Sequence, residues 1–303
     1  MKRFAYLIAA IVAITALSAP AFAQELTGTL KKVKESGSIT LGHRDSSIPF
    51  SYYDDQQRPI GYALDICYKI VDAVKAKLNM PDLKVKLVPE TSSTRIPLMA
   101  NGTLDLECGS TTNNAERKKQ VDFGMTDYVV KYRYVTKKSS HMDKIDDLKG
   151  KTVVSTAGTT DIRALNKLNT ERHFGMNIIA AKDHAEAFLM VETGRASAFL
   201  MDDILLAGLV ANSKDPSEFH ISSESLGLEP YSVMFRKDDP QFKKVVDDAM
   251  SKLYTSGAIE PIYNKWFMSP IPPKGINLNT PPSDALKRVW AHPTDSPDPD
   301  VYK

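Results

Sequence analysis

The sequence predicts an α/β protein of two lobes, each a mostly parallel sheet flanked by helices and joined to the other by two hinge strands. Short apolar runs alternate with stretches of helical periodicity, which is typical of α/β layers around parallel strands. The order strand–helix–strand–helix–strand occurs twice in succession. Two extended β-branched and aromatic runs, at 127–138 and 231–236, stand where the chain would leave the first unit and return to it.

The first unit supplies three expected strands and two expected helices. The strands are residues 39–42, 84–88 and 104–108. Apolar residues recur at helical spacing over 62–79, which predicts a long helix. A shorter helix over 94–100 is stopped by Asn101-Gly102, so the third strand follows after a tight turn.

The second unit repeats this order. Its expected strands are residues 151–155, 177–181 and 198–201, and its expected helices are 161–168 and 185–193. A helix over 240–254 follows the return run, with Pro240 in its first turn, and a further helix holds Tyr263 and Trp266. From Pro270 the chain is rich in proline and polar residues, so we expect a surface strap with a loose terminus.

The two extended runs set the expected lobe boundaries. Lobe I would comprise residues 24–131 together with 232–303, and lobe II residues 132–231. Two crossings between the lobes create a hinge and a cleft. Clefts of this kind are where small ligands usually bind.

The two cysteines can be interpreted in two ways. Cys67 shares a helical apolar stripe with Val71 and Val74, and Cys108 ends an apolar strand. We expect two separate buried thiols, and a single disulfide is the alternative in an oxidising compartment. Two cysteines and six scattered histidines offer no metal-ligand spacing, so no metal or other cofactor is expected.

The beginning of the chain predicts export. A basic pair precedes an apolar run over 4–17, and Ala21-Phe22-Ala23 is a small-x-small cleavage pattern, so residues 1–23 are interpreted as a signal peptide. Gln24 follows the cut instead of a cysteine, so we expect a periplasmic protein without a lipid anchor. Loss of the basic pair leaves 37 basic against 37 acidic residues, which argues against a nucleic-acid partner.

Two polar turns after predicted strands could each bind an anion. In the first, Ser110 and Thr112 offer hydroxyls and Arg117 a guanidinium, which suit a carboxylate or phosphate. The second, residues 155–160, ends at Thr160 and lacks the Gly-Lys-Ser/Thr of a nucleotide-binding loop. The alternative for both is an ordinary polar turn with a helix cap.

Further polar candidates stand at strand ends and helix starts. Arg44 follows the first strand, and Arg95 opens a helix after the turn that contains Ser92. His184 stands in the first turn of a helix, where a neutral imidazole is favoured over a protonated one. Asp202 ends an apolar strand, a position that often faces the crevice of an α/β sheet. The alternative is an exposed surface role for the basic residues and a helix cap for the acid.

Five motifs in the mature chain resemble one family. In chain order they are Pro49-Phe50-x-Tyr-x-Asp, Gly61-Tyr62-x-x-Asp65, Asn101-Gly102-x-x-Asp105, Glu116-Arg117 and Asp122-Phe123. Together they resemble the periplasmic polar amino-acid-binding proteins, which have the type II periplasmic binding protein fold and serve ATP-driven importers. The likeness extends through Trp266. The runs 42–53, 107–114 and 181–184 most resemble the members that bind glutamate and aspartate.

The resemblance implies a role for each candidate residue. Arg117 would bind the α-carboxylate with help from Ser110 and Thr112, and Asp202 would receive the α-ammonium. The side-chain carboxylate would be surrounded by Arg44, Ser92, Arg95, Thr160 and His184. The chain departs from the close relative at Ala157, where that relative has a hydroxyl residue, and the segment 228–230 has no clear counterpart.

Charge supports an acidic ligand. Three arginines against one acid, Asp202, give the expected site an excess of two positive charges, which a second ligand carboxylate offsets. We therefore predict a non-catalytic, monomeric receptor that delivers glutamate or aspartate to an inner-membrane ABC permease. The alternative is an enzyme on the same scaffold, similar to periplasmic dehydratases of a cyclic carboxylate. Such an enzyme needs a free general acid or base, and each candidate residue already has a binding role.

Overall fold

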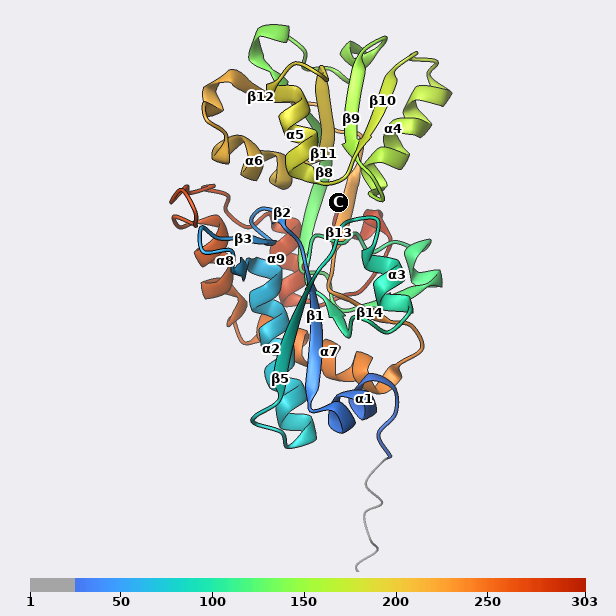
Figure 1. Cartoon of the computed structure of the whole chain (residues 1–303), viewed down its shortest axis with the longest axis vertical. Coiled ribbons are helices and arrows are strands. Elements are labelled where there is room, and N and C mark those ends of the chain that lie inside the picture. Colours follow the sequence, from blue (N-terminus) through green and yellow to red (C-terminus); the bar gives the residue numbers. More distant parts are fainter. Residues whose placement is uncertain (1–24) are drawn as a thin grey trace, which may run out of the picture.

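The computed structural model describes residues 25–303 and consists of two α/β lobes, one above the other in Figure 1. The predicted signal peptide, residues 1–23, lies outside the described residues. The helices are α1 (Gly28–Ser36), α2 (Tyr62–Leu78), α3 (Arg95–Ala100), α4 (Thr160–Glu171), α5 (His184–Glu192), α6 (Asp203–Asn212), α7 (Pro240–Thr255), α8 (Ile259–Phe267) and α9 (Asp284–Ala291). The strands are β1 (Ser38–His43), β2 (Ser46–Ser47), β3 (Ser51–Tyr53), β4 (Pro59–Ile60), β5 (Lys84–Pro89), β6 (Leu106–Glu107), β7 (Val121–Phe123), β8 (Tyr128–Lys137), β9 (Thr152–Thr156), β10 (Asn177–Ala181), β11 (Ala198–Asp202), β12 (Phe219–Ile221), β13 (Leu228–Tyr231) and β14 (Met234–Arg236).

Lobe I contains a sheet with the strand order β5-β1-β6-β14-β7. Strands β5, β1 and β6 are parallel, and β1 pairs with β5 along its whole length, from Ser38↔Lys84 to His43↔Pro89. Strand β14 is antiparallel to both β6 and β7. The sheet is therefore mixed: the parallel part comes from the predicted strand–helix–strand unit and the antiparallel part from the returning chain.

Lobe II repeats this plan with the strand order β10-β9-β11-β8-β12. Strands β10, β9 and β11 are parallel, and β8 is antiparallel to β11 and β12. All five residues of β11 are buried, which agrees with its unbroken apolar run up to Asp202. In both lobes the carboxyl ends of the parallel strands face the other lobe, so the residues that follow them meet between the lobes.

Two extended strands connect the lobes, as predicted. Strand β8 leaves lobe I and β13 returns beside it, paired antiparallel from Leu228↔Lys131 to Tyr231↔Tyr128. In Figure 1 the two strands cross the middle of the molecule next to each other. The boundaries proposed from the sequence, after residues 131 and 231, fall within β8 and at the end of β13.

The expectation of two separate thiols is wrong, because Cys67 and Cys108 form a disulfide with their Cα atoms 6.1 Å apart. Both cysteines are fully buried, as their apolar surroundings indicated. What the sequence did not reveal is that α2 packs on the sheet with its Cys67 face at the end of β6. The bond therefore ties this helix to the segment that leaves the sheet after Glu107.

The expectation of a loose terminus is also wrong. The tail forms α9 and ends against the strands that join the lobes (Figure 1). Trp290 packs edge-on against the ring of Tyr263, with centroids 5.3 Å apart. Tyr302 is only 2% exposed, and its hydroxyl lies 2.7 Å from Oγ1 of Thr126. Burial of these two aromatic rings fixes an otherwise polar segment. Within residues 25–303, every helix is too short or too polar to cross a membrane.

Candidate ligand site between the lobes

A small cavity lies between the lobes. Lobe I contributes the start of α3 and the segment after β6, and lobe II contributes the starts of α4 and α5 and the end of β11. The lining residues are Ser92, Arg95, Ser110, Thr112, Thr159, Thr160, Asp161, His184, Met201, Asp202 and Leu205. This list includes seven of the nine residues predicted to bind a ligand.

The other two predicted residues contact the cavity wall. Nη2 of Arg44 donates a hydrogen bond to Oγ of Ser92 at 2.8 Å. Nη1 of Arg117 donates to the carbonyl oxygen of Thr112, also at 2.8 Å. The structure thus brings all nine predicted residues to one place, although they are spread over residues 44–202 of the chain.

The three arginines enter the site from different elements of lobe I. Arg44 directly follows β1, Arg95 is the first residue of α3, and Arg117 begins a short 3-10 turn after the polar segment. Each is 2% exposed. A Cβ added at Gly109 would clash with Oε1 of Glu107 and lie 2.8 Å from Cγ of Arg44, so a side chain here would displace both groups.

Several buried N–H groups of these side chains find no acceptor among the described residues. They are Nη1 of Arg44, Nε of Arg95 and Nε of Arg117. Burial, and then the charge of Arg95, lower the pKa of Arg117 to about 9, so it is still a cation at neutral pH. Buried cationic donors without a protein acceptor are costly, and carboxylates are their best partners. The arrangement therefore suits an anionic guest.

The start of α4 forms the opposite wall. Thr159 is its cap, since Oγ1 accepts a hydrogen bond from the backbone N–H of Ile162 at 3.2 Å. The helix cap expected as the alternative for this turn is therefore present, and it is Thr159. Because Thr159 caps the helix, Thr160 and Asp161 are left to line the cavity.

His184 is the first residue of α5, which Asp183 caps through the N–H of Glu186 at 2.9 Å. Its Nδ1 lies 2.8 Å from Oγ1 of Thr156, and its Nε2 has no partner among residues 25–303. Burial, with Arg44 and Arg95 nearby, holds the pKa of His184 well below its usual value. The imidazole is therefore neutral, as the sequence suggested.

The two neighbouring acids at the end of β11, Asp202 and Asp203, have different roles. Asp203 accepts backbone N–H bonds from Ile204 at 2.9 Å and Lys131 at 3.2 Å. Asp202 lines the cavity, and its Oδ2 accepts a hydrogen bond from the hydroxyl of Tyr231. Burial, followed by the neighbouring Asp161, raises the pKa of Asp202 well above its usual value. A cation placed between these two acids would favour their ionised forms.

Four buried acids near the arginines were missed by the sequence analysis. Asp161 lines the cavity, and Glu229 accepts hydrogen bonds from the hydroxyls of Thr112 and Thr160, both at 2.6 Å. Burial raises the pKa of each of these two acids to about 7. The remaining two, Glu90 and Glu107, are fully buried in lobe I and close enough to Arg44 to affect its pKa.

The count of one acid against three arginines is therefore wrong. Asp161 could have been suspected because it follows Thr160 at a helix start. Glu229 stands in the segment 228–230 that had no counterpart, and no local signal placed it next to Thr112. With these carboxyl groups present, the net charge of the site depends on their protonation and does not by itself decide the ligand class.

The lobes touch at the site. Nη2 of Arg117 donates to the carbonyl oxygen of Gly158 at 3.3 Å, and the hydroxyl oxygens of Thr112 and Thr160 are 3.3 Å apart. Arg117 and Thr112 belong to lobe I, whereas Gly158 and Thr160 belong to lobe II. Residues that line the cavity therefore also form contacts between the lobes.

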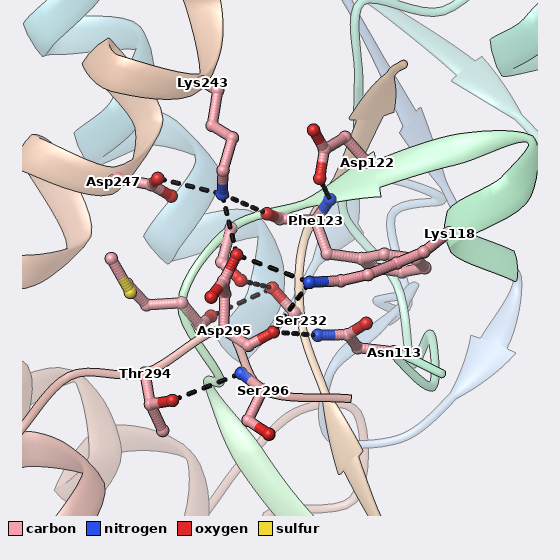
Figure 2. Close-up of polar contacts among 12 residues, drawn as sticks. Asn113, Lys118, Asp122, Phe123, Ser232, Lys243, Asp247, Thr294, Asp295 and Ser296 are labelled. Atoms are coloured by element: carbon pink, nitrogen blue, oxygen red, sulfur yellow. Dashed lines mark hydrogen bonds and ion pairs between the residues drawn. The ribbon is translucent and has the colours of Figure 1, made fainter. Parts of the chain in front are cut away.

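The C-terminal tail holds the segment that carries Thr112 and Arg117 (Figure 2). The carbonyl oxygen of Asp295 accepts hydrogen bonds from Nδ2 of Asn113 and Nζ of Lys118, both at 2.9 Å. Its carboxylate pairs with Lys243 at 2.9 Å and with Lys118 at 3.4 Å. Both ends of the segment are thus fastened to the same tail residue.

Among residues 25–303, no group of three or more His, Cys, Asp or Glu side chains is arranged to hold a metal ion. Guanidinium groups and hydroxyls face carboxyl groups across a small space, so a zwitterion with an extra anionic group would find partners for all its charges.

The family of bacterial extracellular solute-binding proteins, family 3, matches this chain over residues 39–269. A curated relative from Pseudomonas aeruginosa, an L-glutamate/L-aspartate-binding protein, is 54% identical over 290 residues, which is 95% of this chain and 96% of the relative. A glutamate/aspartate import solute-binding protein from Escherichia coli is 52% identical over 267 residues, 88% of each chain.

Solved structures show the same fold. An ancestral arginine-binding protein bound to arginine superposes with a TM-score of 0.69 and 25% sequence identity, covering 76% of this chain and 98% of that one.

Proposed function

The chain belongs to family 3 of the bacterial extracellular solute-binding proteins, and on that basis we propose that it captures L-glutamate and L-aspartate between its lobes for import. The observation that carries the proposal is the cavity itself. Arg95 and the neutral imidazole of His184 line it together with Asp161 and Asp202. Arg44 and Arg117, which also have unpartnered N–H groups, are hydrogen-bonded to the lining residues Ser92 and Thr112. An acidic amino acid supplies two carboxylates and one ammonium to such a site.

We assign the ends of the ligand to the two sides of the cavity. Arg117 binds the α-carboxylate with Ser110, and Asp202 receives the α-ammonium on its unpartnered Oδ1. The side-chain carboxylate takes the open N–H groups of Arg44, Arg95 and His184 at the far end, together with the hydroxyl of Ser92. Thr112 and Thr160 stand between the two ends, next to Asp161.

Closure of the lobes couples binding to delivery. The ligand contacts residues of both lobes, so it stabilises the closed arrangement more than any open one. The two antiparallel strands that join the lobes are the elements about which they would move. A permease could then distinguish the closed protein by the shape of the joined lobe surfaces.

The chain is a binding protein and not an enzyme, since the curated relatives that are 52–54% identical to it over 88–95% of its length are solute-binding proteins. A dehydratase would need an acid or base free to act on a bond of its substrate. Here Oδ2 of Asp202 is occupied by Tyr231, and His184 is a neutral group held by Thr156.

We further propose the route and the partner. Residues 1–23 direct export and are cleaved, and the mature chain acts as a monomer in the periplasm. It delivers its ligand to an inner-membrane ABC permease, in line with the word import in the names of two relatives.

Isothermal titration calorimetry on residues 24–303 tests the function. The protein is unfolded, dialysed and refolded first, to remove any amino acid acquired during expression. We expect a dissociation constant for glutamate or aspartate of about 1 μM or tighter, close to −8 kcal/mol, and no heat with arginine or cystine. Binding of arginine or cystine in preference to both acids would refute the proposal.

A further inference from the structure

One carboxylate oxygen joins the two lobes behind the cavity. Oε2 of Glu229 lies 2.6 Å from the hydroxyl oxygen of Thr112 in lobe I and 2.6 Å from that of Thr160 in lobe II. Glu229 belongs to β13, one of the strands that connect the lobes, and is 7% exposed. It does not line the cavity, whereas both threonines do.

The short distances define which group donates. An ionised carboxylate can only accept hydrogen bonds, and each threonine hydroxyl has a single proton. Separations of about 2.5–2.7 Å are typical of a hydroxyl that donates to a carboxylate. The contact between the two hydroxyl oxygens is longer, at 3.3 Å. Both hydroxyl protons therefore point at Glu229 and away from the cavity.

Because the protons of both hydroxyls are used in hydrogen bonds to Glu229, these hydroxyls can only accept hydrogen bonds from a ligand. Next to them in the cavity wall stand Asp161 and Asp202, which are also acceptors when ionised. These four side chains, on one side of the cavity, can therefore accept hydrogen bonds from a ligand but cannot donate any. Of the charged groups in an amino acid, only the ammonium is a donor that fits such a wall.

We propose that Glu229 is a positioning residue that fixes the hydroxyls of Thr112 and Thr160 as acceptors for the ammonium of the ligand. The inference rests on the proposed function, since it assumes an amino acid in the cavity. The proposal changes the role of both threonines, which the sequence analysis assigned to the carboxylates of the ligand. Those carboxylates are then bound by the arginines and by backbone N–H groups. Because the threonines come from different lobes, the arrangement forms only when the lobes meet.

The charges around Glu229 agree with an ionised acceptor. Arg117 and Arg95 both favour the ionised form of its carboxyl group, as does the hydrogen bond from Thr112. Burial acts in the opposite direction and is the larger effect, which brings the pKa of Glu229 to about 7. Measurements at pH 8 therefore examine the state in which both threonines donate.

The test compares two ligands that differ only in the ammonium. Titration calorimetry at pH 8 measures the affinity for glutamate, and displacement of glutamate measures that for glutarate, the same diacid without the amino group. The variants are Glu229→Met, which keeps the volume and removes the acceptor, and Glu229→Gln, which restores a neutral acceptor. Glu171→Gln is the control, because this exposed residue of α4 lies away from the cavity and its substitution removes the same charge.

We expect Glu229→Met to reduce the preference for glutamate over glutarate by about tenfold or more, as for a buried hydrogen bond to a charged group. Glu229→Gln and the control should keep that preference within about threefold of the wild-type value. A general loosening of the fold would weaken the binding of both ligands equally and leave the preference unchanged. An unchanged preference in Glu229→Met, or an equal fall in Glu229→Gln, would overturn the inference.

A second variant covers the case in which Glu229→Met does not fold. Thr160→Val keeps the shape of the side chain and removes the lone pairs, so the preference for glutamate over glutarate should again fall by about tenfold. If Thr160→Val leaves the preference intact, the acceptor role is wrong. If the wild-type protein binds no glutamate at all, the proposed function fails first and this inference fails with it.

Discussion

Gly158 of lobe II lies directly against the backbone of Ser92 in lobe I. A Cβ built on Gly158 would approach the carbonyl oxygen of Ser92 to 2.7 Å, and Gly158 has a φ of +80°, which favours glycine. The turn before α4 can therefore meet the turn before α3 only because this position has no side chain. The contact stands beside the cavity, so it connects lobe closure to the fit of the ligand.

Substitution of Gly158 should impair closure. We expect Gly158→Ala to weaken glutamate binding by about tenfold or more, because a backbone clash of this kind cannot be relieved by a rotamer change. Calorimetry measures the loss. Gly175→Ala is the matched control, since Gly175 also has a positive φ, of +63°, but an added Cβ meets no atom within 4 Å. Equal losses in the two variants would show that backbone strain, and not lobe contact, is responsible.

Arg95 and Arg117 should differ in what they recognise. Loss of one partner of a buried charged pair costs about 2–5 kcal/mol, so Arg117→Ala should abolish measurable binding of every amino acid. Arg95→Ala should instead reduce the ratio of the affinities for glutamate and glutamine by about tenfold. The exposed Arg172, replaced by Ala, serves as the control. If Arg95→Ala leaves this affinity ratio unchanged, Arg95 does not contact the side-chain carboxylate.

Binding should strengthen as the pH rises. Burial raises the pKa of Asp161 to about 7, and its ionised form favours the ammonium of the ligand. The ligand therefore lowers this pKa on binding, a proton leaves, and affinity falls as the pH drops below about 7. Glu229 acts in the same direction, whereas His184 stays neutral and contributes nothing.

Calorimetry from pH 5.5 to 8.5 on the wild type and on Asp161→Asn tests this linkage. Glutamate itself keeps the same charges over this range, since its side-chain carboxyl titrates near pH 4.3. The variant should lose the part of the pH dependence that Asp161 supplies and retain the parts from Glu229 and Asp202, because burial raises the pKa of these two acids as well. Arg117 also lies near Asp161, and because its pKa is lowered to about 9 it begins to lose its charge only at the upper end of this range. A full pH dependence in the variant would exclude Asp161 as the titrating group.

The disulfide should stabilise lobe I. Cys67 and Cys108 are separated by 41 positions, and closing a loop of that length stabilises a fold by about 4 kcal/mol in the chain-entropy view. Guanidinium unfolding of the oxidised protein and of the protein kept reduced should differ by about this amount. The double variant Cys67→Ala/Cys108→Ala should be insensitive to the reductant. Equal free energies of unfolding would mean that the bond does not constrain the unfolded chain.

Asp295 should contribute to stability through its contacts with Lys118 and Lys243. Its carboxylate is about a third exposed, so we expect Asp295→Ala to lose only about 1 kcal/mol, or about 2–4 °C in the melting temperature. Asp300→Ala removes a more exposed ion pair with Lys303 and should have almost no effect. A large effect of Asp300→Ala would show that the tail acts through its charge and not through the contacts in Figure 2.

Local patterns were sufficient for most of the fold. The strand predicted at 177–181 has these bounds in the structure, and the helix predicted at 62–79 differs by one residue. The strand predicted at 104–108 is assigned only at Leu106–Glu107, although the N–H of Cys108 still bonds to the carbonyl of Gly42. Periodicity and turn residues act over a few positions, so they locate elements and their ends well.

Long-range relationships could not be predicted in the same way. The sequence shows that Cys67 and Cys108 are buried, but not that they touch, because contact depends on how α2 packs on the sheet. Glu229 follows a glycine-containing turn and resembles any strand residue, yet it ends between Thr112 and Thr160. The arginines were predicted because they stand after strands or at helix starts and because the resemblance to a known family gave each a role, whereas Glu229 had neither signal.

The affinity of the mature protein for glutamate relative to glutamine tests the central claim most directly. These ligands have nearly the same shape and differ only in the side-chain carboxylate that Arg44, Arg95 and His184 are proposed to bind. Calorimetry at pH 7.5 should give glutamine a dissociation constant at least about a hundredfold weaker, as expected when buried donors lose a charged acceptor. Equal affinity for the two would contradict the account.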